Sequence, residues 1–148
     1  MKIDVRPATL SDIPSVANDL LEAGVTDMIR AGYHPVLVMA EDILNDDTYL
    51  VSTEEGKPLC MMGISKDGCI WIHMTNEVKK YPVAYIRWTR RFVDKLPHPV
   101  LHNRIDIQNT NLIKFVKHFG FKVINVMAQG PNNNYHVEIV KLWRGWPQ

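Results

Sequence analysis

The sequence predicts a single α/β domain in which a mixed sheet carries helices on its faces. Segments typical of strands follow one another along the chain with segments in which apolar residues recur at helical spacing. At 148 residues the chain has a common size for one domain, and no linker, repeat or low-complexity block interrupts it. We therefore treat residues 1–148 as one domain with the element order β-α-α-β-β-β-α-β-α-β-β.

The first third of the chain predicts a short strand followed by helices. Residues Ile3–Arg6 alternate between apolar and polar side chains and precede a proline, as in an edge strand. A helix capped by Thr9 or Ser11 should follow, because apolar residues then recur at helical spacing as far as Gly24, a natural helix terminator. Weaker patterns predict two shorter helices, over residues 26–31 and 39–44.

The middle of the chain predicts an antiparallel meander and then a long helix. Three apolar runs are separated by turns that contain glycine, lysine and acidic residues. These strands are expected over residues 48–53, 59–65 and 69–75. Pro82 then occupies the first turn of a helix whose apolar stripe ends at Leu96, before Pro97.

The last third predicts a strand-helix-strand unit closed by a hairpin. An amphipathic helix over Asn109–Phe119 ends at Gly120 and lies between two strand patterns. The strands are expected over residues 100–107, 121–127 and 135–142, and the turn-rich residues 129–134 join the last two.

Composition argues against several classes of protein. With 17 basic and 16 acidic residues the formal charge is +1, which does not favour a general binder of nucleic acid or membranes. No apolar run suits a signal peptide or a membrane span, so we expect a cytoplasmic protein. Cys60 and Cys69 lie in apolar strand patterns and are expected to be small buried residues rather than a disulfide. No spacing of histidine, cysteine or carboxylate residues indicates a metal site.

Two segments carry a resemblance to a known family. Val5–Ile13 is similar to the strand-to-helix opening of many GNAT-superfamily N-acetyltransferases, and Asn109–Phe121 is similar to their late helix, with its leading asparagine and closing Gly-Phe. Together with the element order, the resemblance covers nearly the whole chain. It implies the GNAT-like acyl-CoA N-acyltransferase fold, in which two splayed parallel strands and the N-terminus of the central helix hold acyl-CoA.

The chain departs from the family's pattern at the phosphate-binding loop. That loop is rich in glycine in the family, whereas residues 76–85 contain none, and Pro82 removes one backbone amide. The residues that would bind acetyl-CoA here are Lys79, Lys80, Val83, Ala84 and Asn109. The lysines and the main chain at the helix start would hold phosphate, and the asparagine would hold the cofactor arm. Solvated lysines and an asparagine helix cap are the structural alternatives.

The catalytic groups are a second departure. Many members place a proton-donating tyrosine in the late helix, where this chain has Val116, which cannot donate a proton. His73, on the third strand of the meander, is the first candidate for the general base, and Glu77 is the second. Alternation puts Trp71 and His73 on one face of that strand, so a packed histidine without a catalytic role is the alternative.

Three features narrow the resemblance. They are Asn109–Thr110 at the start of the late helix, the lysine-rich Val78–Lys80 before the central helix, and the aromatic Trp71. These features are similar to the internal virion protein A and acyltransferase-like proteins of short-tailed phages. The resemblance implies a phage-encoded protein that acts in the infected bacterium on a phage or host protein.

Two functions from different classes follow. The favoured one is a non-catalytic interaction or virion-assembly protein, in which the cofactor cleft is reused or blocked by bulky side chains such as Trp71, Tyr81 or Tyr85. The alternative is an acetyl-CoA-dependent N-acetyltransferase with a modified cofactor loop.

Two further features allow other partners. Lys79–Lys80 and the arginines at 87, 90 and 91 suggest a nucleic-acid accessory, but arginines at this spacing form a solvated helix face that needs no ligand. Trp143 and Trp146, near the end of the chain, should cover the domain's own sheet or else contact a partner.

Overall fold

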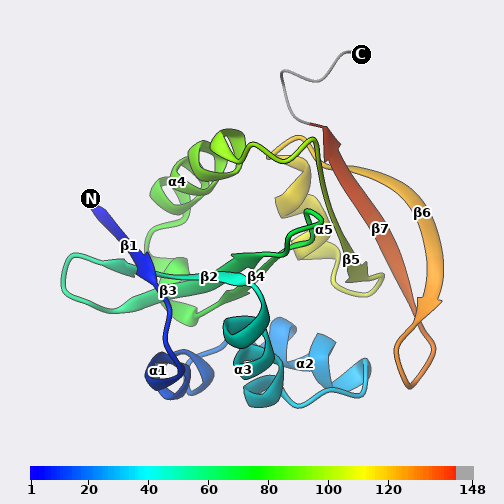
Figure 1. Ribbon diagram of the computed structural model, residues 1–148, viewed down its shortest axis with the longest axis horizontal. Helices are drawn as coiled ribbons and strands as arrows, with labels where there is room; N and C mark the ends of the chain where they lie inside the picture. The colour runs from blue at the N-terminus through cyan, green and yellow to red at the C-terminus, as the bar shows by residue number, and fades with distance from the viewer. Residues whose placement is uncertain (143–148) are drawn as a thin grey trace.

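The computed structural model describes residues 1–142, and the tryptophans at 143 and 146 lie outside this range. Within it, seven strands form two sheets, in the orders β1-β2-β3-β4 and β5-β7-β6, with helices on both faces of the first sheet (Figure 1). The strands are β1 (Ile3–Pro7), β2 (Asp47–Thr53), β3 (Pro58–Ile64), β4 (Ile70–Met74), β5 (Val100–Asp106), β6 (Lys122–Gln129) and β7 (Asn134–Leu142). The α-helices are α1 (Ile13–Ala17), α2 (Glu22–Arg30), α3 (Pro35–Asn45), α4 (Pro82–Lys95) and α5 (Thr110–Lys117), and the 3-10 helices are η1 (Leu10–Asp12) and η2 (Asn76–Lys80). The predicted α/β class, the meander and the late strand-helix-strand unit are confirmed.

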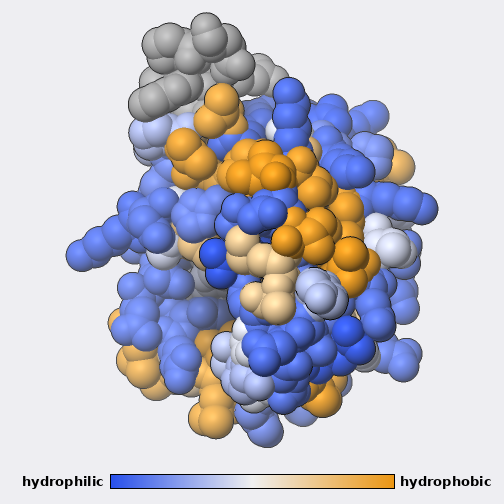
Figure 2. All heavy atoms as spheres, turned by 90° about the vertical axis from the view of Figure 1, so that its right-hand side faces the viewer, coloured by the Kyte–Doolittle hydropathy of each residue, from blue (hydrophilic) through white to orange (hydrophobic). Residues whose placement is uncertain are grey.

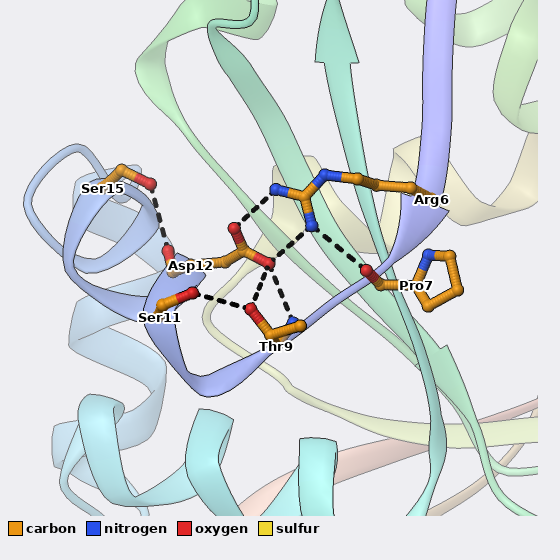
Figure 3. A network of polar contacts seen from close by, with 6 residues as sticks. All are labelled: Arg6, Pro7, Thr9, Ser11, Asp12 and Ser15. Atoms are coloured by element: carbon orange, nitrogen blue, oxygen red, sulfur yellow. Dashed lines mark hydrogen bonds and ion pairs between the residues drawn. The ribbon is translucent and has the colours of Figure 1, made fainter.

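A polar network fixes the turn between β1 and α1 (Figure 3). The guanidinium of Arg6 donates to both carboxylate oxygens of Asp12, at 2.6 and 2.9 Å, and the Thr9 N–H donates to the same carboxylate at 2.8 Å. The hydrogen bond from Arg6 lowers the pKa of Asp12 despite its burial. Because Arg6 of β1 and the backbone of Thr9 both bind the carboxylate of Asp12, the turn that leads into α1 is held in one conformation.

The helix predicted to run as far as Gly24 ends at Ala17 instead. The Leu21 N–H donates to the carbonyl of Met74 at 3.0 Å, so the connection between α1 and α2 pairs with the end of β4. Gly24 then lies inside the first turn of α2 rather than at a helix end. This part of the prediction was wrong because a contact between distant residues replaced the local helical pattern.

The two sheets meet at one point and then separate. Cys69 forms a single parallel bridge with His102, and the side-chain amide of Asn103 donates to the carbonyl of Ile70. Beyond these contacts, β4 and β5 belong to different sheets. A Cβ on Gly68 would lie 2.2 Å from the carbonyl oxygen of Val100, so the close approach of the two strands requires glycine there. The parallel strands thus form a fork that opens toward their carboxyl ends.

Apolar clusters cover both faces of the first sheet. Met61 packs with α1 and α3 on one face, and Met62 packs with Tyr85 of α4 on the other. A third cluster joins β5, β7 and α5. Cys60 and Cys69 are both free thiols, and burial raises the pKa of Cys60 to about 12.

The edge strand β6 exposes apolar side chains. Val123, Ile124 and Val126 are all exposed. Figure 2, viewed from the side of β6, shows apolar residues gathered on this part of the surface. None of the described helices combines the length and the apolar character needed to cross a membrane.

Candidate functional site

At the open end of the fork, a cavity of about 370 Å³ lies between the carboxyl end of β4, the start of α2 and α5, and we call it the fork cavity. Its wall is mostly apolar and includes Ile72, Leu112 and Phe115. Lys79 and Asn109, two of the predicted cofactor-binding residues, also line it. The Asn109 side chain accepts a hydrogen bond from the Leu112 N–H at 3.2 Å, so its predicted role as a helix cap is confirmed.

The backbone of β4 faces this cavity along one edge. At one end of the strand the Ile70 carbonyl accepts from Asn103, and at the other end the Met74 carbonyl accepts from Leu21. Because alternate residues of a strand point their N–H and C=O groups to the same edge, those of Ile72 point into the fork between these two contacts. An extended ligand with amide groups can pair with such an edge as an added strand does.

A second cavity, of about 250 Å³, lies between β4 and β5 and is also lined by α2, α5 and β7. Five residues line both cavities: Gly24, Met28, Ile72, His73 and Leu112. The two cavities therefore adjoin. Of the residues that they share, only His73 can accept or donate a proton.

His73 is held by Asp42 of α3. Its Nε2 lies 3.1 Å from a carboxylate oxygen of Asp42, and the two side chains are 12% and 20% exposed. The ring of Trp71 lies beside it, with the ring centroids 4.9 Å apart. Because a carboxylate only accepts, Nε2 carries the proton in the neutral imidazole and Nδ1 remains an acceptor. A carboxylate that holds one ring nitrogen fixes the orientation of the imidazole and leaves the other nitrogen as an acceptor.

Two carboxylates of the second cavity differ in their partners. Asp27 of α2 accepts a hydrogen bond from the Asn109 side chain, and burial raises its pKa. Asp106, whose side chain is fully buried, binds Nε of Arg30 at 2.8 Å. Burial opposes the charge on Asp106, but the hydrogen bonds from Arg30 and from the Gln108 N–H outweigh it and lower its pKa.

The remaining predicted residues lie outside both cavities, at the junction of η2 and α4. Glu77 is buried and pairs with Lys80 at 3.1 Å. Val83 and Ala84 follow Pro82 in the first turn of α4, and no side chain caps that turn. The amides of Val83 and Ala84 thus point away from the helix without an intrahelical acceptor, as first-turn amides do. Of the two predicted bases, the structure brings only His73 to the fork.

None of the three bulky residues expected to block the cofactor cleft lines the fork cavity. Tyr85 is 2% exposed and packs under α4, and Tyr81 belongs to the same apolar cluster. Trp71 lines only the second cavity. Val116, at the position of the family's tyrosine, is buried in an apolar cluster and also lines the second cavity.

Sequence reasoning missed Asp42 and Asp27. Asp42 precedes His73 by 31 residues and lies on a helix whose pattern was weak, so no local spacing joins them. Within residues 1–142, no group of three or more histidine, cysteine or carboxylate side chains is arranged to hold a metal ion.

Solved structures of low sequence identity share this architecture. Spermidine N-acetyltransferase from Vibrio cholerae, solved with CoA and spermine, has a TM-score of 0.70 at 10% identity, over 95% of each chain. The chain has the N-acetyltransferase fold. AAC(6')-Ib, solved with ribostamycin and coenzyme A, gives a TM-score of 0.70 at 13% identity, over 96% of this chain and 94% of its own. No protein-family model matches the sequence, and no curated protein is similar to it.

Proposed function

We propose that this protein is an acyl-CoA-dependent N-acyltransferase that holds the acyl thioester in the fork cavity and an amine in the second cavity. The observation that carries the proposal is the position of His73, in the wall common to both cavities and bound to Asp42. Both solved structures described above contain CoA, which supports the choice of cofactor.

The residues of the fork cavity suit the narrow arm of acyl-CoA that carries the thioester better than they suit the phosphates of acyl-CoA. The apolar wall, the free edge of Ile72 and the Asn109 side chain suit a narrow chain with amide groups. Phosphate would rely on Lys79 and on the first-turn amides of α4, because the glycine-free loop gives no close cradle. When bound, acyl-CoA supplies an activated acyl group and a thiolate leaving group.

The protein's own residues would then prepare the amine. Asp27, in the wall of the second cavity, attracts an ammonium group. His73 would accept a proton from this ammonium group at Nδ1, which leaves a neutral amine, and Asp42 would stabilise the resulting imidazolium through Nε2–H. The neutral amine then has a free lone pair with which to attack the thioester carbonyl.

Initial rates of acetyl-CoA consumption with a panel of primary amines test the proposal. His73→Gln should lower kcat by about 100-fold or more, and Asp42→Asn by about 10-fold with an altered pH profile. His118→Gln, an exposed histidine outside both cavities, is the matched control and should keep the wild-type rate. Wild-type turnover that persists in His73→Gln would remove His73 from the mechanism.

The second candidate function is a non-catalytic interaction protein, as in virion assembly. The glycine-free loop, Pro82 and Val116 favour it, because each removes a group on which the family's chemistry depends. The narrower resemblance to phage proteins supports the same idea. The non-catalytic function predicts that no amine in the panel is acylated and that acetyl-CoA does not bind.

A further inference from the structure

Basic residues gather on the exposed face of two neighbouring helices. Each of the six is exposed, and they come from segments separated by β5 in the sequence. On α4 they are Arg87, Arg90, Arg91 and Lys95, and on α5 they are Lys114 and Lys117. We call this set the basic face.

The two helices form one surface. Nη2 of Arg90 donates to the carbonyl of His118 at 2.8 Å, which joins the middle of α4 to the end of α5. Beneath them, the rings of Tyr85 and Phe115 stack with centroids 6.1 Å apart. Asp94 is the only acidic residue in the sequence of either helix, and it is half-buried beside Nζ of Lys141 at 3.1 Å. The basic face therefore presents six cations and no exposed carboxylate of its own helices.

Opposite charge lies on the other side of the sheet. Residues 8–47, which form α1 to α3, contain eight acidic residues and one arginine. Figure 1 shows α1 to α3 on one side of the first sheet and α4 on the other. The formal charge of +1 is therefore the sum of an acidic layer, α1 to α3, and a basic layer on the other side of the sheet. Like charges gathered in this way give the basic face a positive local potential.

Helix stability does not explain the basic face. Lys95, Lys114 and Lys117 lie in last turns, where a cation stabilises the helix dipole. Arg87 lies in the middle of α4 and gains nothing from this effect. In the sequence, the arginines of α4 are explained as a solvated helix face. The structure places α5, which carries two further exposed lysines, beside α4, so the basic residues of both helices belong to one surface.

The surroundings favour phosphate as the partner group. A surface that binds an anionic membrane or an acidic protein usually has exposed apolar side chains among its charged ones. The only large apolar residue strongly exposed on the described α4 and α5 is Val83, at the start of α4. Trp88 and Phe92 stack on each other in an apolar cluster, so they are not presented to unpaired bases.

We propose that the basic face binds the phosphate backbone of a nucleic-acid duplex without reading its sequence. Cations on two adjacent helices contact phosphates, and among the described residues of α4 and α5 no aromatic group is presented for the stacking that single strands use. This binding is independent of the fork, because none of the six residues lines either cavity.

Fluorescence anisotropy with a mixed-sequence DNA duplex of about 20 base pairs tests the proposal. A footprint of about five phosphates gives a slope of about −4.5 in log K against log salt, so Kd should rise about 500-fold between roughly 50 and 200 mM salt. The triple variant Arg87→Gln, Arg91→Gln, Lys114→Gln should bind at least tenfold more weakly and reduce the slope by about three.

A second triple variant with the same change in charge is the control. It replaces exposed lysines away from the basic face: Lys2→Gln, Lys57→Gln and Lys66→Gln. It should bind the duplex within about twofold of wild type, and thermal melting should show both variants folded. Equal losses in the two variants would overturn the proposal, as would binding to phosphatidylserine vesicles or to polyglutamate without binding to the duplex.

Discussion

Substitutions of Gly24 should make the protein more stable and, with a large side chain, less able to bind the proposed cofactor acetyl-CoA. It lies in the first turn of α2 and lines both cavities, and a Cβ added there would meet no atom within 4 Å. Gly24→Ala should therefore raise the free energy of unfolding by about 0.5–1 kcal/mol, because alanine loses less backbone entropy on folding.

Gly24→Leu should keep that gain and place a side chain where the two cavities meet. A ligand in the 370 Å³ fork would have to shift or repack around it, which costs about 1–3 kcal/mol. That penalty corresponds to roughly a 5- to 150-fold rise in Kd for acetyl-CoA.

Urea denaturation and calorimetric titration measure the two effects, and Gly24→Ala is the matched control. If the leucine variant binds acetyl-CoA as tightly as the alanine variant does, Gly24 does not border the bound ligand. If both variants are less stable than wild type, Gly24 does not have open space around it.

Three further predictions concern stability and reactivity. Asp12→Asn should cost about 1 kcal/mol at pH 7, a small value because Arg6 is half exposed, and pH-dependent denaturation should show the difference from wild type shrinking as the pH falls below about 4. The direction of this pH dependence follows from the lowered pKa of Asp12, because its carboxylate is charged and stabilises the fold only above the pH range in which Asp12 titrates. Cys60, with a pKa of about 12, should resist a thiol reagent at pH 8 until the protein unfolds, and rapid native labelling would contradict its burial. Gly63→Ala should lower stability by about 2–3 kcal/mol, because its Cβ would lie 2.2 Å from the ring of Trp71; an unchanged melting temperature would show that this ring can move.

Local patterns predicted most of the elements. Pro82 marked the start of α4 and Gly120 follows the end of α5, because both residues act through the backbone at their own positions. The meander was visible for the same reason, since turns and alternation are short-range features.

Long-range contacts account for what local patterns missed. The end of α1 depends on the hydrogen bond from Leu21 to Met74, more than 50 positions away. The site depends likewise on Asp42 meeting His73, and the basic face depends on α5 lying beside α4. The residue type predicted His73 as a possible base, but only the fold shows that Asp42 holds it and that it lines two adjoining cavities.

The binding of the cofactor arm is the central physical claim, and calorimetric titration of the wild-type protein tests it most directly. Acetyl-CoA and S-acetylpantetheine, which lacks the nucleotide and pyrophosphate, are the two ligands to compare. We predict saturable binding of both, with affinities within about tenfold (about 1.4 kcal/mol), because the fork contributes more than the glycine-free loop. No heat from either ligand at millimolar concentration would contradict the claim and favour the non-catalytic function.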